Sequence, residues 1–144
     1  MSSTLDARKA ALLDELFAQA KNLPPMPGVN LETLIRGYYR HVSAVDLIDR
    51  TSRDLGATVL HHLDTASDRP QGTAVVRLVT PLHDRDGWSL NGRTVVEVVT
   101  DDMPFLVDSV TMALDGLGHD VHLVMHPQFV VRRDLGGDLL ELLD

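Results

Sequence analysis

A chain of 144 residues with 44% apolar and 24% charged residues has the composition of one soluble globular domain, which excludes disordered, collagen-like and membrane-embedded classes. The net charge of −8 argues against a nucleic-acid-binding surface, since such surfaces need clustered Lys and Arg. With no cysteine, no signal-peptide pattern and no run of about 18 apolar residues, we expect a cytoplasmic protein without disulfides or a membrane partner.

Residues 1–42 predict two helices joined by a stiff linker. A capping-box pattern begins at Ser3, and apolar residues then recur at helical spacing up to the linker. The linker "NLPPMPGVN" contains three prolines and a glycine, which favour restricted, extended geometry. Asn30 can cap a second helix, whose apolar stripe continues to Val42. We expect these residues to form a helical appendage to a main domain over 43–144.

The main domain is predicted to open with a long helix and a hairpin. A second capping-box pattern at Ser43 begins a helix that extends to about Ser67. The next two segments, 73–80 and 94–100, are rich in β-branched residues, and Asp-Gly and Asn-Gly turn signals lie between them. This pattern predicts an antiparallel pair of strands with a long connection.

A second helix and hairpin follow. The helix that starts near Pro104 carries an apolar stripe. From Val121 to Arg133 the residues then alternate between an apolar side and a mostly polar side, which also holds Val124 and Val130. Pro127 places that strand at a sheet edge or bulge. Residues 134–138 form a turn, and the chain stops within the return strand, so we expect it to be a fragment of a longer protein.

The whole order from residue 43 is αββαββ. Two helices separated by hairpins suit an α+β fold of the ACT or ferredoxin-like kind, a four-stranded antiparallel sheet with two helices on one face. In that arrangement the strand that begins at residue 121 lies at an edge, in agreement with its proline.

The stretch "VVEVVTDDMPFLVDSVTMALDGLGHDVHLVMH" resembles the first strand, helix and second strand of an ACT domain, the small amino-acid-responsive module. Asp102, Met103 and Pro104 match the Asp-x-Pro-Gly loop of that family. Phe105 stands where the general ACT pattern has glycine. The departure weakens the expectation of an amino-acid site.

A narrower resemblance is to the N-terminal region of the large bacterial NAD-specific glutamate dehydrogenases, and it extends over about residues 35–144. It rests on five segments: Gly87-Trp88, the strand Thr94–Val99, the decapeptide "DDMPFLVDSV" that starts at Asp101, "HLVMHP" (122–127) and the closing Arg-Arg-Asp, Arg132–Asp134. The resemblance implies a long polypeptide that oxidises glutamate to 2-oxoglutarate with NAD in a distant C-terminal domain. It implies that this segment is a non-catalytic regulatory or assembly domain without a cofactor, whose partners are the remaining domains and further copies in a homo-oligomer.

The loop before the second helix has two interpretations. Asp101 and Asp102 can start the helix, because a carboxylate accepts N–H bonds from the first turn and suits its positive end. Alternatively, Asp101, Asp102, Met103, Pro104 and Phe105 form an effector loop, in which helix N–H groups hold a carboxylate or the aspartates hold an ammonium group. The second interpretation makes the chain an amino-acid-binding sensor.

Arg77 and Glu97 mark a candidate interface. If they face each other across the hairpin, they form an ion pair among four valines (75, 79, 95 and 99). Should the two helices of the main domain cover the opposite face, this face would stay exposed, and an exposed apolar patch usually marks an interface.

No catalytic, cofactor-binding or metal-binding residue is predicted. His122 and His126 lie about 13 Å apart on a strand, and His119 precedes the strand with opposite parity, so one metal ion cannot reach all three. Ser109 has no accompanying nucleophile motif. His61 and His62 are expected to face solvent on their helix.

Overall fold

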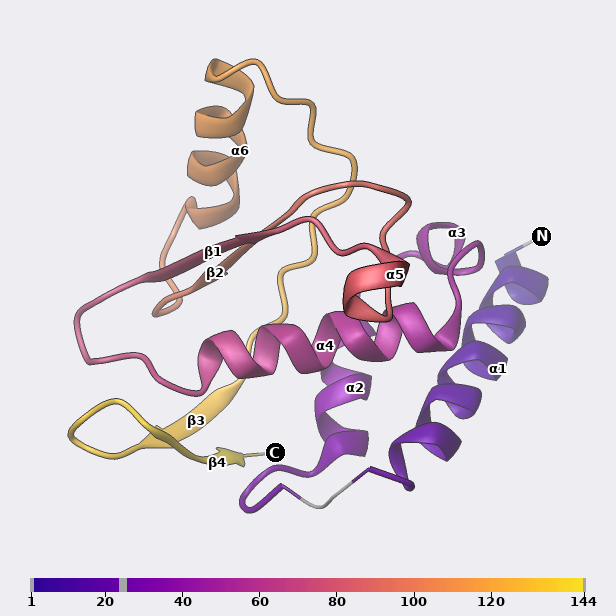
Figure 1. The fold of residues 1–144 in the computed structure, drawn as a ribbon, viewed down its shortest axis with the longest axis horizontal. Helices are drawn as coiled ribbons and strands as arrows, with labels where there is room; N and C mark the ends of the chain where they lie inside the picture. The colour runs from indigo at the N-terminus through magenta and orange to yellow at the C-terminus, as the bar shows by residue number, and fades with distance from the viewer. Residues whose placement is uncertain (1, 24–25, 144) are drawn as a thin grey trace.

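The computed structural model describes residues 2–23 and 26–143. The helices that precede residue 67 pack together beside two small antiparallel sheets (Figure 1). The elements in chain order are α1 (Ser2–Ala20), α2 (Leu31–Tyr39), α3 (Ala44–Leu47), α4 (Ser52–Ala66), β1 (Val75–Val79), α5 (His83–Asp86), β2 (Val95–Val99), α6 (Leu106–Gly116), β3 (Val130–Arg133) and β4 (Leu139–Leu143). No helix in the described ranges is long and apolar enough to cross a membrane.

The hydrophobic core lies among α1, α2, α3 and α4. Tyr39 and Leu47 are fully buried, and Leu55 and Val59 on α4 are 1% exposed. Leu16 of α1 joins the same cluster, so core residues lie on both sides of position 42. The hydroxyl of Tyr39 donates to the carbonyl oxygen of Leu55 at 2.6 Å, which satisfies a polar group inside this core.

Helix capping agrees with the sequence pattern in α2 but not in the next helix. The Asn30 side chain accepts from the N–H of Thr33 at 3.1 Å, as predicted. Ser43 makes no side-chain cap bond, and the single helix expected from there to Ser67 is broken between α3 and α4. Thr51 caps α4 by accepting from Asp54 N–H at 3.1 Å, and this local bond competes with a continuous helix.

The first hairpin matches the prediction. β1 and β2 pair antiparallel, with Arg77 directly opposite Glu97. Asn91 and Gly92 both have positive φ angles, 57° and 77°, as a tight Asn-Gly turn requires. Figure 1 shows α4 running along this hairpin, with α2 on the other side of α4.

The second hairpin is shorter than predicted. Only residues 130–133 of the expected strand form β3, which pairs with β4. Residues 121–129 do show the predicted alternation of half-buried odd and exposed even positions, but they make no strand pairing. Phe129 lies against Gly37 of α2, where an added Cβ would come within 2.6 Å of its ring. The segment therefore contacts α2, where the prediction had it pair with a neighbouring strand.

The four-stranded sheet is not confirmed, because β1–β2 and β3–β4 form separate sheets. The backbone N–H of Leu139 donates to Ser67 at 2.8 Å, and that of Leu142 donates to Gly28 at 2.8 Å. These bonds attach the second hairpin to the loops around the helical core, and they use N–H groups that sheet pairing would need.

The helix predicted after Pro104 is present as α6, but it does not cover a sheet. It buries no residue, and Figure 1 shows it projecting from the far end of β2. Met112 and Leu117 are 71% and 73% exposed. On the apolar stripe of α6, Leu106, Val110 and Leu114 are half-buried, whereas Leu117, just after the helix, is exposed.

Candidate functional site

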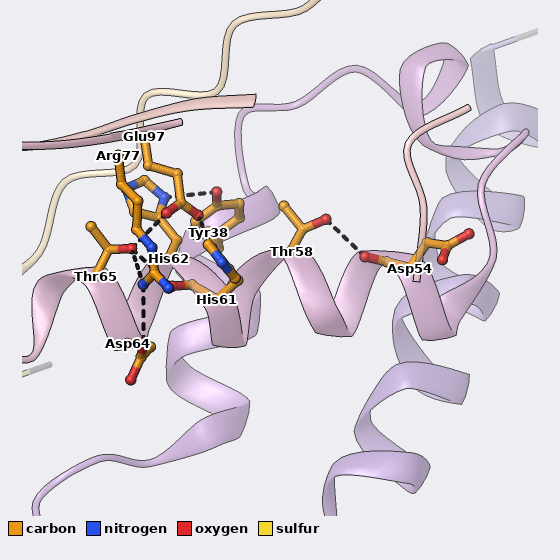
Figure 2. Close-up of polar contacts among 9 residues, drawn as sticks. All are labelled: Tyr38, Asp54, Thr58, His61, His62, Asp64, Thr65, Arg77 and Glu97. Atoms are coloured by element: carbon orange, nitrogen blue, oxygen red, sulfur yellow. Dashed lines mark hydrogen bonds and ion pairs between the residues drawn. The ribbon is translucent and has the colours of Figure 1, made fainter. Parts of the chain in front are cut away.

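Glu97 is a buried carboxylic acid between α4 and the first hairpin, with 3% of its surface exposed. Its Oε2 atom lies 2.9 Å from Nδ1 of His61, and its Oε1 atom accepts from the Thr65 hydroxyl at 2.6 Å (Figure 2). His61 and Thr65 are one helical turn apart on α4, so both reach the same carboxylate. Each carboxylate oxygen therefore has a donor, as a buried acid requires.

Arg77 does not pair directly with Glu97, although the two residues are cross-strand neighbours. Its Nη1 atom donates to Asp64 at 3.0 Å and to the Thr65 hydroxyl at 3.2 Å (Figure 2). The Thr65 hydroxyl therefore bridges Arg77 and Glu97, and the predicted direct ion pair is not formed. Helix α4 covers the face that carries Glu97, and Val76 and Leu78 on the opposite face are exposed. Of the predicted interface pair, only Arg77 keeps an exposed side chain.

His62 forms a second polar contact with α2. Its Nδ1 atom lies 2.9 Å from the Tyr38 hydroxyl (Figure 2). Burial, and then the charge of Glu97, raise the pKa of Tyr38, so the phenol keeps its proton; the donor in its hydrogen bond with His62 is set by the imidazole tautomer. Burial lowers the pKa of His62 below its ordinary value of 6.5, and the Glu97 charge offsets this only in part.

The prediction that His61 and His62 face solvent is wrong, because both imidazoles have partners inside the fold. The available signal was the single acidic residue in the apolar strand at 95–99: a buried Glu97 needs donors, and the histidines of the preceding helix are suitable donors.

A cavity of about 630 Å³ opens between the helical core and the two hairpins. Much of its wall is apolar, including Leu34, Val59, Leu63, Val98, Met125 and Phe129. Its polar lining includes Tyr38, His62, Arg69, Asp101, Asp102, Gln128 and Arg133. The structure therefore brings part of the predicted effector loop to a cavity that also contains two arginines.

The two aspartates of the loop line the cavity and do not cap α6. Asp101 accepts from Arg69 Nη2 at 2.7 Å, and Asp102 accepts from Gln128 Nε2 at 3.2 Å. The residue at the cap position is Phe105, in the left-handed region with φ 63° and no side-chain cap bond. The capping interpretation is therefore wrong: the left-handed Phe105 directs the chain into α6, and the aspartates lie too early in the loop.

The remaining loop residues are separate from the cavity. Met103, Pro104 and Phe105 are exposed, and Phe105 has 76% of its surface open to solvent. Within the effector loop, the structure thus brings together only the two aspartates at the cavity, and leaves the other three residues at the surface.

Arg133 has no predicted role beyond its place in the Arg132–Asp134 segment of the family resemblance. Its Nη1 atom donates to the carbonyl oxygen of Gly137 at 2.9 Å, and its Nε atom is buried without a hydrogen-bond partner in the described chain. Burial, followed by the nearby charge of Arg69, lowers the pKa of Arg133. A register shift between Arg132 and Arg133 gives these neighbours different surroundings, which simple strand alternation does not predict.

Within residues 2–23 and 26–143, no three His, Cys, Asp or Glu side chains cluster as metal ligands would. His119, His122 and His126 are all exposed. The charged and polar side chains that line the cavity could bind a small molecule through ion pairs and hydrogen bonds.

Comparison with known proteins places this chain in a family. The family model described as "Glutamate dehydrogenase, ACT1 domain" matches residues 34–144. An NAD-specific glutamate dehydrogenase of Pseudomonas aeruginosa is 35% identical over 133 residues, which cover 91% of this chain and 8% of that protein. An NAD-specific glutamate dehydrogenase of Halomonas elongata is 36% identical over 106 residues, which cover 72% of this chain and 6% of that protein.

The chain thus spans less than a tenth of the length of these relatives. No solved structure matches it. The resemblance inferred from "DDMPFLVDSV" is confirmed by the family match, which includes that segment. The chain belongs to the family of glutamate dehydrogenase ACT1 domains.

Proposed function

We propose that this chain is a non-catalytic regulatory and assembly segment of a large NAD-dependent glutamate dehydrogenase. The remaining domains of the same polypeptide carry out the oxidation of glutamate to 2-oxoglutarate with NAD, in a cytoplasmic homo-oligomer. The observation that supports this proposal is the ACT1 match over 34–144 in a chain that corresponds to 8% of a relative named as an NAD-specific glutamate dehydrogenase.

The surface of the C-terminal half supports an assembly role. Val76 and Leu78 on β1 are 57% and 67% exposed, and Met112 and Leu117 at α6 are more exposed still. Large apolar side chains gathered on one half of a domain favour contact with another protein surface. We propose that other domains of the polypeptide contact this half.

One experiment tests the non-catalytic part. The purified 144-residue chain is mixed with glutamate and NAD, and the absorbance of NADH is followed. We expect no turnover, and steady NADH formation would overturn the proposal.

A second experiment tests assembly in the full-length enzyme. Met112→Glu introduces a charge at an exposed apolar residue of α6, whereas Ser109→Glu introduces the same charge at an exposed polar residue one turn away. We expect Met112→Glu to weaken the oligomer or its domain contacts, measured by light scattering and limited proteolysis. Identical behaviour of the two variants would contradict the assembly role.

A second candidate function is an amino-acid sensor that binds its ligand at residues 101–107. The observation that favours it is that Asp101 and Asp102 line the cavity. Titration calorimetry with a panel of amino acids separates the two functions, since silence at millimolar concentrations favours the assembly role.

A further inference from the structure

The cavity contains one arginine that forms no ion pair in the described residues, although the charge of the exposed Asp68 acts on it from beyond 4.0 Å. Arg69 and Arg133 both line it, and the charge of Arg69 is paired with Asp101 at 2.7 Å. Arg133 has no acidic side chain within 4.0 Å in the described ranges. It is half-buried, and an unpaired charge that is partly removed from water is destabilising. An anion at this position would be stabilising.

The turn after β3 holds the Arg133 side chain in place. The carbonyl oxygen of Gly137 accepts both from Arg133 Nη1 at 2.9 Å and from the backbone N–H of Arg69 at 2.9 Å. Gly137 has φ +103°, and a Cβ there would come within 2.5 Å of the Arg69 backbone. Glycine therefore allows the close approach that joins the two arginines. With one Nη1 hydrogen held by Gly137, the guanidinium keeps further terminal N–H donors for a carboxylate.

Other acidic groups at the cavity leave Arg133 as the partner for an anion. Asp134 accepts from the backbone N–H of Asp138 at 2.9 Å, and Asp102 accepts from Gln128. Both aspartates are exposed, so water and salt screen their repulsion. The half-buried arginine is screened less.

The rest of the cavity selects for an apolar body. Leu63, Val98 and Phe129 are among the side chains that line it. Its volume of about 630 Å³ lies in the range of roughly 300–1,000 Å³ that is typical of small-molecule sites. A lone inorganic anion would leave most of this apolar surface in contact with water.

We propose that the cavity binds a monocarboxylate with an apolar body, with the carboxylate at Arg133 and the body against the apolar wall. The inference rests on the proposed function, because such a ligand would be an effector of the parent enzyme. It differs from the amino-acid sensor in needing no ammonium group.

Titration calorimetry on the 144-residue chain at low salt tests the proposal with four matched probes: 4-phenylbutyrate, 4-phenylbutanol, 4-phenylbutylamine and phenylalanine. We expect 4-phenylbutyrate to bind at least tenfold more tightly than the alcohol, and the amine not to bind. Equal binding of the acid and the alcohol would overturn carboxylate recognition. Binding of phenylalanine without 4-phenylbutyrate would assign the cavity to amino acids and also overturn the proposal. These comparisons use the unaltered chain, so they do not depend on the folding of a variant.

A pair of variants locates the carboxylate. Arg133→Gln should weaken 4-phenylbutyrate binding at least tenfold. Arg132→Gln, at an exposed neighbour paired with Glu141, should change it less than twofold. Equal effects of the two substitutions would contradict a site at Arg133. A chain that binds none of the probes would overturn this inference, while the assembly role would still be decided by Met112→Glu.

Discussion

The helical half and the C-terminal half of this chain bury their apolar residues to very different extents. Tyr39 and Leu47 in the helical half are fully buried, whereas Met112 and Leu117 in the other half are more than two-thirds exposed. Helices α1, α2 and α4 share one core, but α6 buries no residue. The helical half can therefore be stable through its own packing, and the C-terminal half depends on its attachments to that half.

Three attachments hold the C-terminal half in place. Glu97 is bonded to α4, the β3–β4 hairpin donates backbone N–H groups to Ser67 and Gly28, and Phe129 packs on α2. Each attachment joins residues far apart in the sequence, and the cavity lies among them. The difference between the halves can be tested by substitutions in the core, at the attachments and at the surface.

The largest effect is expected in the helical core. Leu55→Ala should lower the free energy of unfolding by about 2–5 kcal/mol, because the truncated side chain leaves a cavity. Met112→Ala on α6 should change it by less than about 0.5 kcal/mol, since that side chain is already in water. Urea denaturation measures both. Equal losses would show that the two halves are packed alike.

The attachment of β4 can be tested with two glycines of similar backbone conformation. Gly28 and Gly72 have φ +75° and +81°, so alanine is strained at both, by about 1–2 kcal/mol. Only at Gly28 would the added Cβ collide with a backbone group, the carbonyl of Leu140. Gly28→Ala should therefore destabilise by about 1–3 kcal/mol more than Gly72→Ala in thermal or urea unfolding. A matching pair of losses would mean that β4 is not held at this turn.

Glu97→Ala removes the attachment of the first hairpin to α4. His61 and Thr65 lose their shared acceptor, which should lower the free energy of unfolding by about 1–3 kcal/mol. The control is Glu141→Ala, whose pairing with Arg132 is solvent-exposed and contributes about 0–1 kcal/mol. Hydrogen exchange of the hairpin amides should increase only in Glu97→Ala. Unchanged exchange there would contradict the attachment.

A smaller effect is expected from pH through His62. Its pKa is lowered in the folded state, so between that value and 6.5 the unfolded chain binds a proton that the folded chain does not. The stability contributed by neutral His62 is therefore fully present above pH 6.5 and is lost as pH falls through that range. Urea denaturation across this range should show a weaker pH dependence for His62→Gln than for the unaltered chain. An identical pH dependence of the two proteins would show that His62 does not contribute to the loss of stability at low pH.

The smallest effect is expected at the loop before α6. Asp102 is exposed and does not cap the helix, so Asp102→Ala should change the free energy of unfolding by less than about 0.5 kcal/mol. A helix cap would contribute about 1 kcal/mol. Thermal melting of the two proteins distinguishes these values, and a loss of the larger size would restore the capping interpretation.

The sequence pattern predicted correctly those elements that depend on side chains close together in the chain. The β-branched runs formed β1 and β2 in the expected register, and Asn30 caps α2. Prediction failed where distant groups compete for the same atoms. Two N–H groups of β4 bond to Ser67 and Gly28, so the expected four-stranded sheet is replaced by two small ones.

The candidate site was predicted only in part for the same reason. Asp101 and Asp102 could be identified as notable from their motif, but their partners Arg69 and Gln128 are 32 and 26 positions away in the sequence. The environment of Arg133 depends on a bulge and on the glycine turn beside it. Neither feature has a periodic signature that would separate Arg133 from Arg132.

The sequence by itself determined the family, the positions of the first hairpin and of α2 and α6, and the alternation of half-buried and exposed residues along 121–129, because these depend on side-chain type and on short-range spacing. Only the tertiary structure decided that Glu97 is buried against His61 and Thr65, that two aspartates line a cavity instead of capping a helix, and that α6 buries no residue. Burial and charge pairing depend on which distant segments meet, and that is a property of the whole packed chain.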